Sequence, residues 1–509
     1  MRWIDALHGP RVASVLVVSL AVTSGCGTVR EQGVPDRNTP TASSTPGTAS
    51  LTTGTDGDAA APSTDTSGDA GADAAAAPDA ATSAPSGPAR TGPLAHFYTA
   101  LDGLASQTRR DHVRVLWLGD SHGQADFWTG RVRKILQKRF GNGGPGFVHI
   151  AYKGYRHDGV DLQMKDKWAT RPRGPATGLS TFDGVFGLGG LLTSSDAAGS
   201  EASVEVRDTS LPKKLTWDLC YRFNKPGESI RVSVSGHKPT TLTAGAKIAA
   251  KPPLLHTSFT TLGDAPPKPA SSASAAPAST VKPADSASAA PASTVKPADS
   301  AAPKQAVSGT SKGPRLEVAP VSGVPFFCGV VVETDPMESP GVVLDALGIN
   351  GARYTTALAW DEEAWLAELS RRSPALVIFE YGTNESGDVG IKVDAYSEKV
   401  GKLVARVRKN KPDTDCVILA PTERADQEER SARIRDILRD AAKENACWFW
   451  DTIETMGGKG AMRAWRAENP PKGAKDGVHL TVRGYQELGD KLAADLLKKY
   501  GAAPTPVTP

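Results

Sequence analysis

Short apolar runs alternate along much of the chain with segments whose apolar residues recur every three or four positions. The runs lie at residues 113–118, 376–379, 416–420 and 447–450. The segments with helical spacing lie at residues 360–369, 400–407, 434–438 and 488–496. Buried strands separated by amphipathic helices are typical of a parallel sheet that helices cover on both faces. The pattern therefore predicts an α/β domain.

Between residues 191 and 335 the pattern changes to a period of two. Residues 229–235 alternate strictly, and Trp217, Tyr221 and Phe223 fall on one face of a second alternating segment. Such segments, separated by turn residues, are typical of antiparallel strands. We therefore expect a β-rich unit inserted into the α/β domain. We also expect the shared aromatic face to lie in its core and not to form a sugar-binding platform.

Two segments have too few large apolar residues to offset the entropy of ordering. Residues 27–90 consist mostly of Ala, Ser, Thr, Pro, Gly and Asp, and residues 264–312 contain one 14-residue sequence twice in succession. We expect the first to be a disordered stalk and the second a disordered loop of the inserted unit. The predicted α/β domain is then discontinuous, with residues 91–190 and 336–503 on either side of the insertion at residues 191–335.

The first 26 residues resemble an export signal. Arg2 and Arg11 precede an apolar run at residues 12–22, and small residues then lead to Cys26. The run is shorter than the roughly 20 residues that cross a bilayer, as signal peptides are. The end of the segment resembles a bacterial lipoprotein signal, in which Cys26 would be acylated, although an ordinary cleaved signal with an incidental cysteine is the alternative. The expected location is the bacterial cell envelope, on the periplasmic side. The outer membrane is favoured over the inner one because Gly27, not Asp, follows Cys26.

Charge and cysteine content restrict the partners. Fifty-nine basic and 56 acidic residues give a net charge of +3, which supplies no cationic field for nucleic acid. No Cys pair has the spacing of zinc ligands, so we expect no metal and no cofactor. Export would permit disulfides among the four cysteines that follow the signal, but the spacing leaves the pairing open. They are Cys220, Cys328, Cys416 and Cys447. We expect a monomer.

Two segments far apart in the chain carry candidate catalytic groups. Ser121 follows the first predicted strand and begins a helix, where a serine can act as a nucleophile and use its own N–H to stabilise an oxyanion. A helix N-cap is the structural alternative. Near the C-terminus, Asp476 precedes His479 by three residues and can orient its imidazole as a general base. A fragment of a metal site or a solvated loop is the alternative there, but no other His lies nearby.

Two further loops follow apolar runs and are therefore expected at the same edge of the sheet as Ser121. Asn384 lies in the segment at residues 380–385, which directly follows the strand at residues 376–379, and its amide could donate to an oxyanion. Gly351 follows an apolar run at residues 342–344, and its N–H can approach a substrate without obstruction by a side chain. Ordinary turn chemistry would account for either loop.

Taken in order, these four pieces resemble the blocks of the SGNH (GDSL-type) hydrolases. They are Gly119-Asp120-Ser121, then Gly351, then Gly382-Thr383-Asn384, then Asp476 with His479. The resemblance implies a three-layer, flavodoxin-like α/β/α fold with Ser121 as nucleophile, His479 as general base and acid, and Asp476 as its orienter. It also implies an oxyanion hole formed by the N–H groups of Ser121 and Gly351 and by the Asn384 side chain. One departure is Glu385, where many members have Asp.

Further features narrow the resemblance to the peptidoglycan O-acetylesterase branch. They are the sequence at residues 119–129, the Gly-rich residues 141–147, the block at residues 381–385 and the β-rich insertion. In that branch the insertion is a small jelly-roll module similar to carbohydrate-binding modules. The implied activity is removal of O-acetyl groups from an acetylated cell-envelope glycan. An O-acetyltransferase of the same fold is one alternative, and a glycan-binding lipoprotein with a vestigial triad is the other.

Overall fold

The structure is a computed structural model, and it describes residues 90–172, 183–261, 313–388, 390, 392 and 395–502. The predicted signal segment at 1–26, the predicted stalk up to residue 89 and the duplicated loop at 264–312 lie outside the described residues. Within the described part of the chain, no helix combines the length and apolar character needed to cross a membrane.

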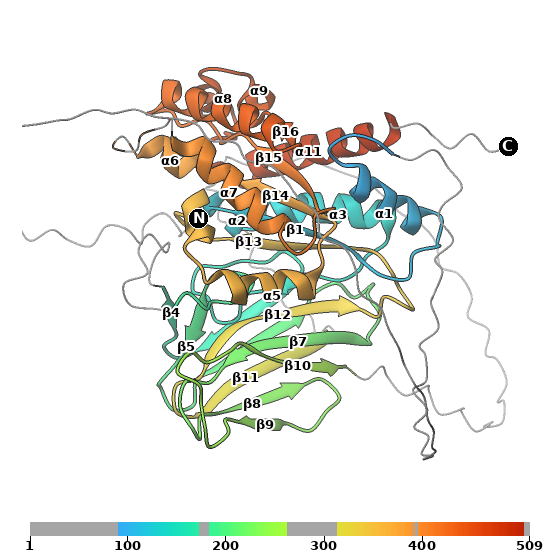
Figure 1. Cartoon of the computed structure of the whole chain (residues 1–509), viewed down its shortest axis with the longest axis vertical. Coiled ribbons are helices and arrows are strands. Elements are labelled where there is room, and N and C mark those ends of the chain that lie inside the picture. The colour runs from blue at the N-terminus through green and yellow to red at the C-terminus, as the bar shows by residue number, and fades with distance from the viewer. Residues whose placement is uncertain are drawn as a thin grey trace, which may run out of the picture. The chain divides into compact units, whose positions relative to one another are not determined.

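A five-stranded parallel sheet, here sheet A, forms the centre of the α/β part (Figure 1). Its strands stand in the order β13-β1-β14-β15-β16, so the second strand in sequence lies at one edge beside the first. This is the order 2-1-3-4-5 of flavodoxin-like folds. The predicted α/β fold class is confirmed. The bounds are β1 Val113–Gly119, β13 Val342–Gly348, β14 Leu376–Glu380, β15 Asp415–Leu419 and β16 Trp448–Trp450.

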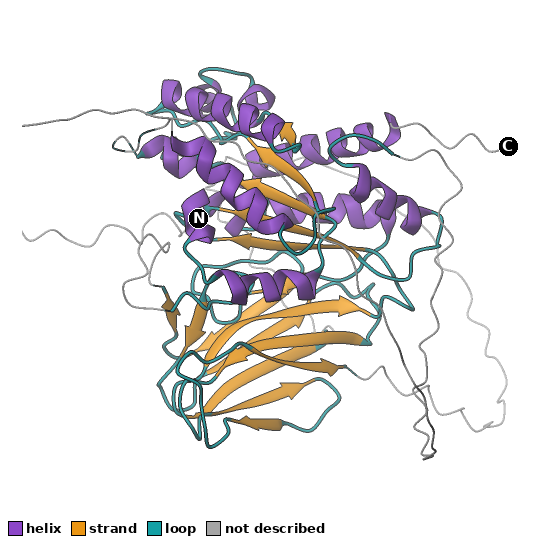
Figure 2. Ribbon diagram, viewed as in Figure 1, coloured by secondary structure: helices purple, strands orange, loops and turns teal. Residues whose placement is uncertain are grey.

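Helices cover both faces of sheet A because its strands are apolar on both sides (Figure 2). In β1, Val115 and Trp117 pack against α1, α3, α9, α10 and α11, whereas Leu116 and Leu118 belong to the core that contains α4, α5, α7 and α8. The first set comprises α1 Ala95–Ala105, α3 Trp128–Phe140, α9 Thr452–Met456, α10 Ala461–Ala467 and α11 Val482–Ala502. The second comprises α4 Tyr354–Leu358, α5 Glu362–Arg372, α7 Tyr396–Arg408 and α8 Glu428–Glu444.

Two short helices begin at the carboxyl edge of sheet A, directly after neighbouring strands. Helix α2, Ser121–Gln124, follows β1, and α6, Thr383–Gly387, follows β14. Open α/β sheets bind ligands at this edge, where the order of the strands reverses. Three of the four predicted site loops therefore follow β1, β13 and β14, which are adjacent in the sheet.

The remaining strands form two antiparallel sheets that pack face to face. Sheet B has the order β10-β7-β12-β5-β4, with β2 also paired to β12, and sheet C has the order β3-β6-β11-β8-β9. The strands of sheet B are β2 Gly146–Val148, β4 Ala169–Arg171, β5 Leu192–Ser194, β7 Leu215–Arg222, β10 Leu255–Thr260 and β12 Phe326–Thr334. Those of sheet C are β3 Val160–Lys165, β6 Glu201–Val206, β8 Ser229–Val234, β9 Thr240–Thr243 and β11 Arg315–Ser322. Both lie between β1 and β13 in the chain, as an insertion would.

The change of period in the sequence predicts that the inserted unit begins at residue 191. In the structure the antiparallel strands begin earlier. Strands β2, β3 and β4, at residues 146–171, pair within sheets B and C. Their pattern is weak because β2 and β4 have only three residues each and follow segments rich in Gly or in polar residues. The other end agrees, since β12 stops at Thr334.

The core between sheets B and C takes in the alternating aromatic face of β7. Trp217 is fully buried, and Tyr221 and Phe223 are 7% and 4% exposed. They pack with Val232 of sheet C and its neighbours, as expected for core residues. The opposite face of β7 is also covered, since Cys220 belongs to the core shared with helices of the α/β part. The aromatic residues of β7 therefore leave no sugar platform on either face.

The four cysteines of the described part form two disulfides. Cys220 of β7 pairs with Cys328 of β12, and Cys416 of β15 pairs with Cys447 before β16. Each bond joins strands that are neighbours in one sheet, which the spacing along the chain does not reveal.

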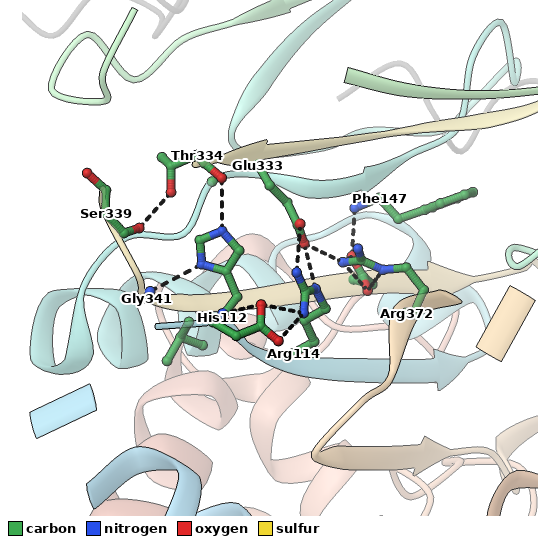
Figure 3. Close-up of polar contacts among 12 residues, drawn as sticks. His112, Arg114, Phe147, Glu333, Thr334, Ser339, Gly341 and Arg372 are labelled. Atoms are coloured by element: carbon green, nitrogen blue, oxygen red, sulfur yellow. Dashed lines mark hydrogen bonds and ion pairs between the residues drawn. The ribbon is translucent and has the colours of Figure 1, made fainter. Parts of the chain in front are cut away.

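A buried ion network joins sheet A to sheet B (Figure 3). Arg372, at the end of α5, donates to Asp345 of β13 and to Glu333 of β12, and Glu333 also accepts from Arg114 of β1. Asp345 Oδ1, which accepts from Arg372, also accepts the N–H of Phe147 in β2 at 2.8 Å. Asp345 is fully buried and Arg372 is nearly so. The junction of the two sheets is therefore held by ion pairs whose members are shielded from water.

Candidate active site

Ser121 begins α2 directly after the end of β1, and the other N–H groups of this short helix are bonded. Those of His122 and Gln124 donate to the side chain and the carbonyl of Asp120, respectively. A helix leaves its first N–H groups without partners inside the helix, so these acceptors are caps. Within the described part of the chain, the N–H of Ser121 has no bonded acceptor. It remains available to an oxygen that carries negative charge.

His479 lies beside Ser121, and Asp476 lies beside His479. Ser121 Oγ is 2.8 Å from His479 Nε2, and His479 Nδ1 is 2.8 Å from Asp476 Oδ2. Because a carboxylate only accepts, Nδ1 carries the imidazole hydrogen and Nε2 is left to accept from the Ser121 hydroxyl. The structure thus brings together Ser121, His479 and Asp476, which are far apart in sequence, in the relation expected of nucleophile, base and orienter.

The loop that carries Asp476 is held by its own backbone. Asp476 Oδ1 accepts the N–H groups of Val478 and His479, both at 2.9 Å, while Oδ2 faces the imidazole. Burial opposes the charge on Asp476, but these hydrogen bonds outweigh it and hold its pKa below the usual value. Burial likewise opposes the charge on His479, but the hydrogen bond and charge of Asp476 raise the pKa of His479 above 6.5.

The imidazole of a second histidine, His122, packs against the imidazole of His479. The two ring centroids lie 5.2 Å apart, and both ring nitrogens of His122 are bonded, to the hydroxyls of Tyr485 and Thr422. Burial holds the pKa of His122 well below its ordinary value, so it stays neutral beside His479. His122 therefore supports the base without adding a second positive charge.

Gly351 presents its N–H at the same edge of the sheet. Its φ of +75° lies in the region that favours glycine, and no described residue accepts its N–H. The loop is fixed on both sides, because Gln124 Oε1 accepts the N–H of Asn350 at 2.6 Å and Arg353 donates to the Gly351 carbonyl at 2.7 Å. Arg353 also forms a bidentate ion pair with Asp388, which follows α6. The Gly351 loop is thereby tied to the loop that carries Asn384.

Asn384 lies in α6 and already has partners for its amide hydrogens. Its Nδ2 donates to Asp120 Oδ2 at 3.1 Å and to the Ala352 carbonyl at 3.0 Å. These bonds place the amide between the loops of Ser121 and Gly351, where the sequence predicts it. An oxyanion would have to share one of these hydrogens, so Asn384 differs from Ser121 and Gly351, whose N–H groups are free.

Sequence reasoning missed several residues that fix these loops. Glu385, noted only as a departure from the usual Asp, is buried and accepts the N–H groups of Gly382 and Tyr354 and the hydroxyl of Tyr396. Gln124 and Arg353 hold the Gly351 loop, and Glu380 lies under the Ser121 turn. Glu380 could have been recognised from the sequence, because it is a carboxylate at the end of the otherwise apolar strand β14.

One group of possible metal ligands lies elsewhere among the described residues, at Cys220, His256 and Glu368. Cys220 is in a disulfide and has no thiolate to offer. Burial opposes the charge of His256, but its hydrogen bonds to Asp218 and Glu368 raise its pKa to about 9. The group is therefore an ion pair between β10 and α5 and carries no argument for a metal.

The raised pKa of His479 sets the expected pH dependence of activity. A protonated imidazole cannot accept the Ser121 proton, so the rate should fall as pH drops through this pKa. We expect kcat/KM for a soluble acetyl ester to have an acid limb with its midpoint above pH 6.5. In Asp476→Asn the midpoint should move to lower pH, and kcat should fall by about 10⁴-fold because the tautomer is no longer fixed. An unchanged midpoint in this variant would assign the limb to another group.

Residues 332–487 match the model of the GDSL-like lipase/acylhydrolase family. The match covers the loops of Gly351 and Asn384 and the pair Asp476 and His479. It begins within β12, the last of the antiparallel strands, and therefore does not include Ser121. No curated protein matches the chain by sequence.

Solved structures match over a larger part of the chain. One described as a peptidoglycan O-acetylesterase in action is 21% identical, with a TM-score of 0.57, over 80% of this chain and 97% of the other. A lipase/acylhydrolase from Enterococcus faecalis is 15% identical, with a TM-score of 0.25, over 33% of this chain and 80% of the other. An acetyl xylan esterase is 18% identical, with a TM-score of 0.24, over 32% of this chain and 83% of the other. The first match shows the fold shared with this chain, and the other two are too weak to carry an argument.

Proposed function

We propose that this chain, which carries a GDSL-like lipase/acylhydrolase domain and is a serine hydrolase that acts on esters, removes O-acetyl groups from peptidoglycan. The observation that carries the proposal is the hydrogen-bonded line from Ser121 through His479 to Asp476, with two free N–H groups at the same edge of the sheet. This geometry suits attack on the carbonyl of a small acyl group.

The proposed reaction proceeds through an acetylated Ser121. Ser121 Oγ attacks the acetyl carbonyl while His479 Nε2 takes the hydroxyl proton, and the N–H groups of Ser121 and Gly351 hold the oxygen that becomes negative. His479 then returns the proton to the departing sugar oxygen, which leaves acetyl-Ser121. Water, deprotonated by His479, attacks this ester. The tetrahedral intermediate then collapses, so that acetate leaves and His479 returns the proton to Ser121 Oγ.

The choice of peptidoglycan rests on the extent of one structural match. The peptidoglycan O-acetylesterase is aligned over 97% of its own length, so the likeness extends beyond the α/β part to the antiparallel sheets. We propose that loops at the edge of these sheets orient the glycan, since the large aromatic residues of β7 are buried. Sugar contact by the inserted strands is thus expected from loops and not from a flat aromatic face.

Acetate release from isolated glycans tests the substrate. We expect the protein to release more acetate from O-acetylated peptidoglycan than from acetylated xylan, and Ser121→Ala to release none from either. Addition of a sugar acceptor separates a hydrolase from a transferase, because a transferase would release less free acetate when an acceptor is present. Faster release from xylan would contradict the proposed substrate, and a fall in acetate with acceptor would contradict hydrolysis.

The proposed location is the periplasmic side of the cell envelope, with a lipid on Cys26 as the anchor. The outer membrane is proposed in preference to the inner one. The pattern of residues 1–26 supports export, and so do the two disulfides, which persist in oxidising compartments.

Fractionation tests the anchor. The unaltered protein should be recovered with membranes, and Cys26→Ala should be soluble, because two acyl chains anchor a protein stably where one gives only marginal binding. Recovery of the unaltered protein in the soluble periplasmic fraction would contradict the anchor and favour an ordinary cleaved signal.

A further inference from the structure

We propose that Glu380 is a positioning residue for the nucleophile: its carboxyl group holds the Ser121 turn from below and shares one proton with Asp120. This inference rests on the proposed role of Ser121 and gives a role to a residue to which the sequence pattern assigns none. Glu380 is the last residue of β14 and pairs in register with Gly119, the last residue of β1.

The space under the turn is shaped for this carboxyl group. A Cβ atom built on Gly119 would lie 2.3 Å from Glu380 Oε2, and one built on Gly123 would lie 3.1 Å from the same oxygen. Both glycines flank Ser121, one before the turn and one within α2. Any side chain at Gly119 would therefore displace the carboxyl group of Glu380. This contact explains why the position before the turn is a glycine.

Glu380 completes the bonding of the turn. It accepts the N–H of Asp120 at 3.2 Å and that of Gly123, while Asp120 itself caps His122 and Gln124. A four-residue helix is too short to hold its own first turn, so these acceptors determine its geometry. The N–H of Ser121 is the one donor of the turn that they leave free.

The same carboxyl group determines the charge under the nucleophile. Glu380 and Asp120 are 4% and 0% exposed, and their side chains are hydrogen-bonded to each other, which requires a proton between them. Burial and the neighbouring Asp120 raise the pKa of Glu380 well above its usual value, and burial raises the pKa of Asp120 to about 6. The pair therefore holds one proton on Glu380 and one negative charge on Asp120 at neutral pH.

Other charged and titratable groups face the pair from several elements and leave this arrangement in place. They are Arg353 and His479 on neighbouring loops, Tyr354 on α4, Tyr381 after β14, Glu385 on α6, Tyr396 on α7 and Tyr485 on α11. The charge on Asp120 matters to catalysis because its Oδ2 accepts from Asn384 Nδ2. Glu380 thus acts on two sides of the site, through the Ser121 turn and through Asn384.

Two substitutions at Glu380 separate its functions. In Glu380→Gln the amide oxygen can still accept from the turn and the amide nitrogen can donate to Asp120, but no proton can be lost. In Glu380→Leu neither contact remains. With p-nitrophenyl acetate we expect Glu380→Leu to lower kcat by about 10² to 10³-fold with little change in KM, the effect of a misplaced oxyanion donor. In the unaltered protein, loss of the Glu380 proton should place two negative charges beside the turn and lower kcat at alkaline pH. We expect Glu380→Gln to keep most of kcat and not to show this fall.

The control is Glu368→Gln, which changes another buried carboxyl, bonded to His256 and remote from the predicted blocks. Its kcat and pH profile should match those of the unaltered protein, and circular dichroism should show that all three variants fold. Full activity in Glu380→Leu, equal losses in both Glu380 variants, or an unchanged alkaline limb in Glu380→Gln would each overturn the inference. The small ester needs no glycan, so failure to act on peptidoglycan leaves this test intact. Full activity in Ser121→Ala would instead reject the proposed nucleophile.

Discussion

Ser121→Ala is expected to lower kcat for acetyl esters by about 10⁴ to 10⁶-fold, because without the hydroxyl no acyl-enzyme forms. Ser121 is half-buried at the start of α2, and its removal leaves every cap of that helix in place. The thermal midpoint should therefore stay close to that of the unaltered protein. Initial rates on p-nitrophenyl acetate, with calorimetry on the same samples, measure both quantities.

A double variant shows whether Ser121 and His479 act as one unit. Ser121→Ala with His479→Ala should be no slower than Ser121→Ala alone, because each single change already removes the same step. Ser106→Ala serves as a control, since Ser106 is an exposed serine after α1 that bonds only to its own turn and its neighbour Thr108. Additive losses at Ser121 and His479 would contradict a joint role.

The second large effect is on stability, at the junction of sheets A and B. Arg372→Met should lower the free energy of unfolding by about 3–5 kcal/mol, because it leaves the buried charge of Asp345 without its arginine partner and removes one of the two arginines that pair with Glu333. Chemical denaturation followed by circular dichroism measures the loss.

Arg371→Met is the matched control for Arg372→Met. Arg371 is the preceding residue of α5, but its side chain is 46% exposed and pairs with Asp218 near the surface. An exposed pair contributes about 0–1 kcal/mol, so this variant should remain close to the unaltered protein. Equal effects at the two positions would show that burial of the network does not determine its contribution.

The central sheet can be predicted from the sequence because each of its strands is a short run of residues that is apolar on both faces. The order of the strands follows less directly, since β1 and β13 are adjacent in the sheet but separated in the chain by all of sheets B and C. The resemblance to a known family supplied that order. Strands β2 and β4 were missed because three residues show no period.

The predicted site residues converge because each follows a strand or precedes a helix at one edge of the sheet. What the sequence could not give is the state of their hydrogen bonds. Asn384 is named correctly as a neighbour of Ser121, but only the structure reveals that Asp120 and Ala352 already accept its amide hydrogens. Glu380 belongs to the same segment as Asn384, but the sequence assigns it no role because a charged residue at a strand end is usually solvated. In the structure it is buried beside Gly119 and Gly123.

Mass spectrometry of the trapped intermediate shows whether Ser121 is the residue that carries the acyl group. The Asn384→Ala protein, expected to turn over slowly, is mixed with an acetyl ester, quenched in acid within its first turnover and digested. We expect one acetyl group on the peptide that contains Ser121, and none in the same experiment with Ser121→Ala. Acetate release without any acetylated peptide, or with the acetyl group on another residue, would contradict this expectation.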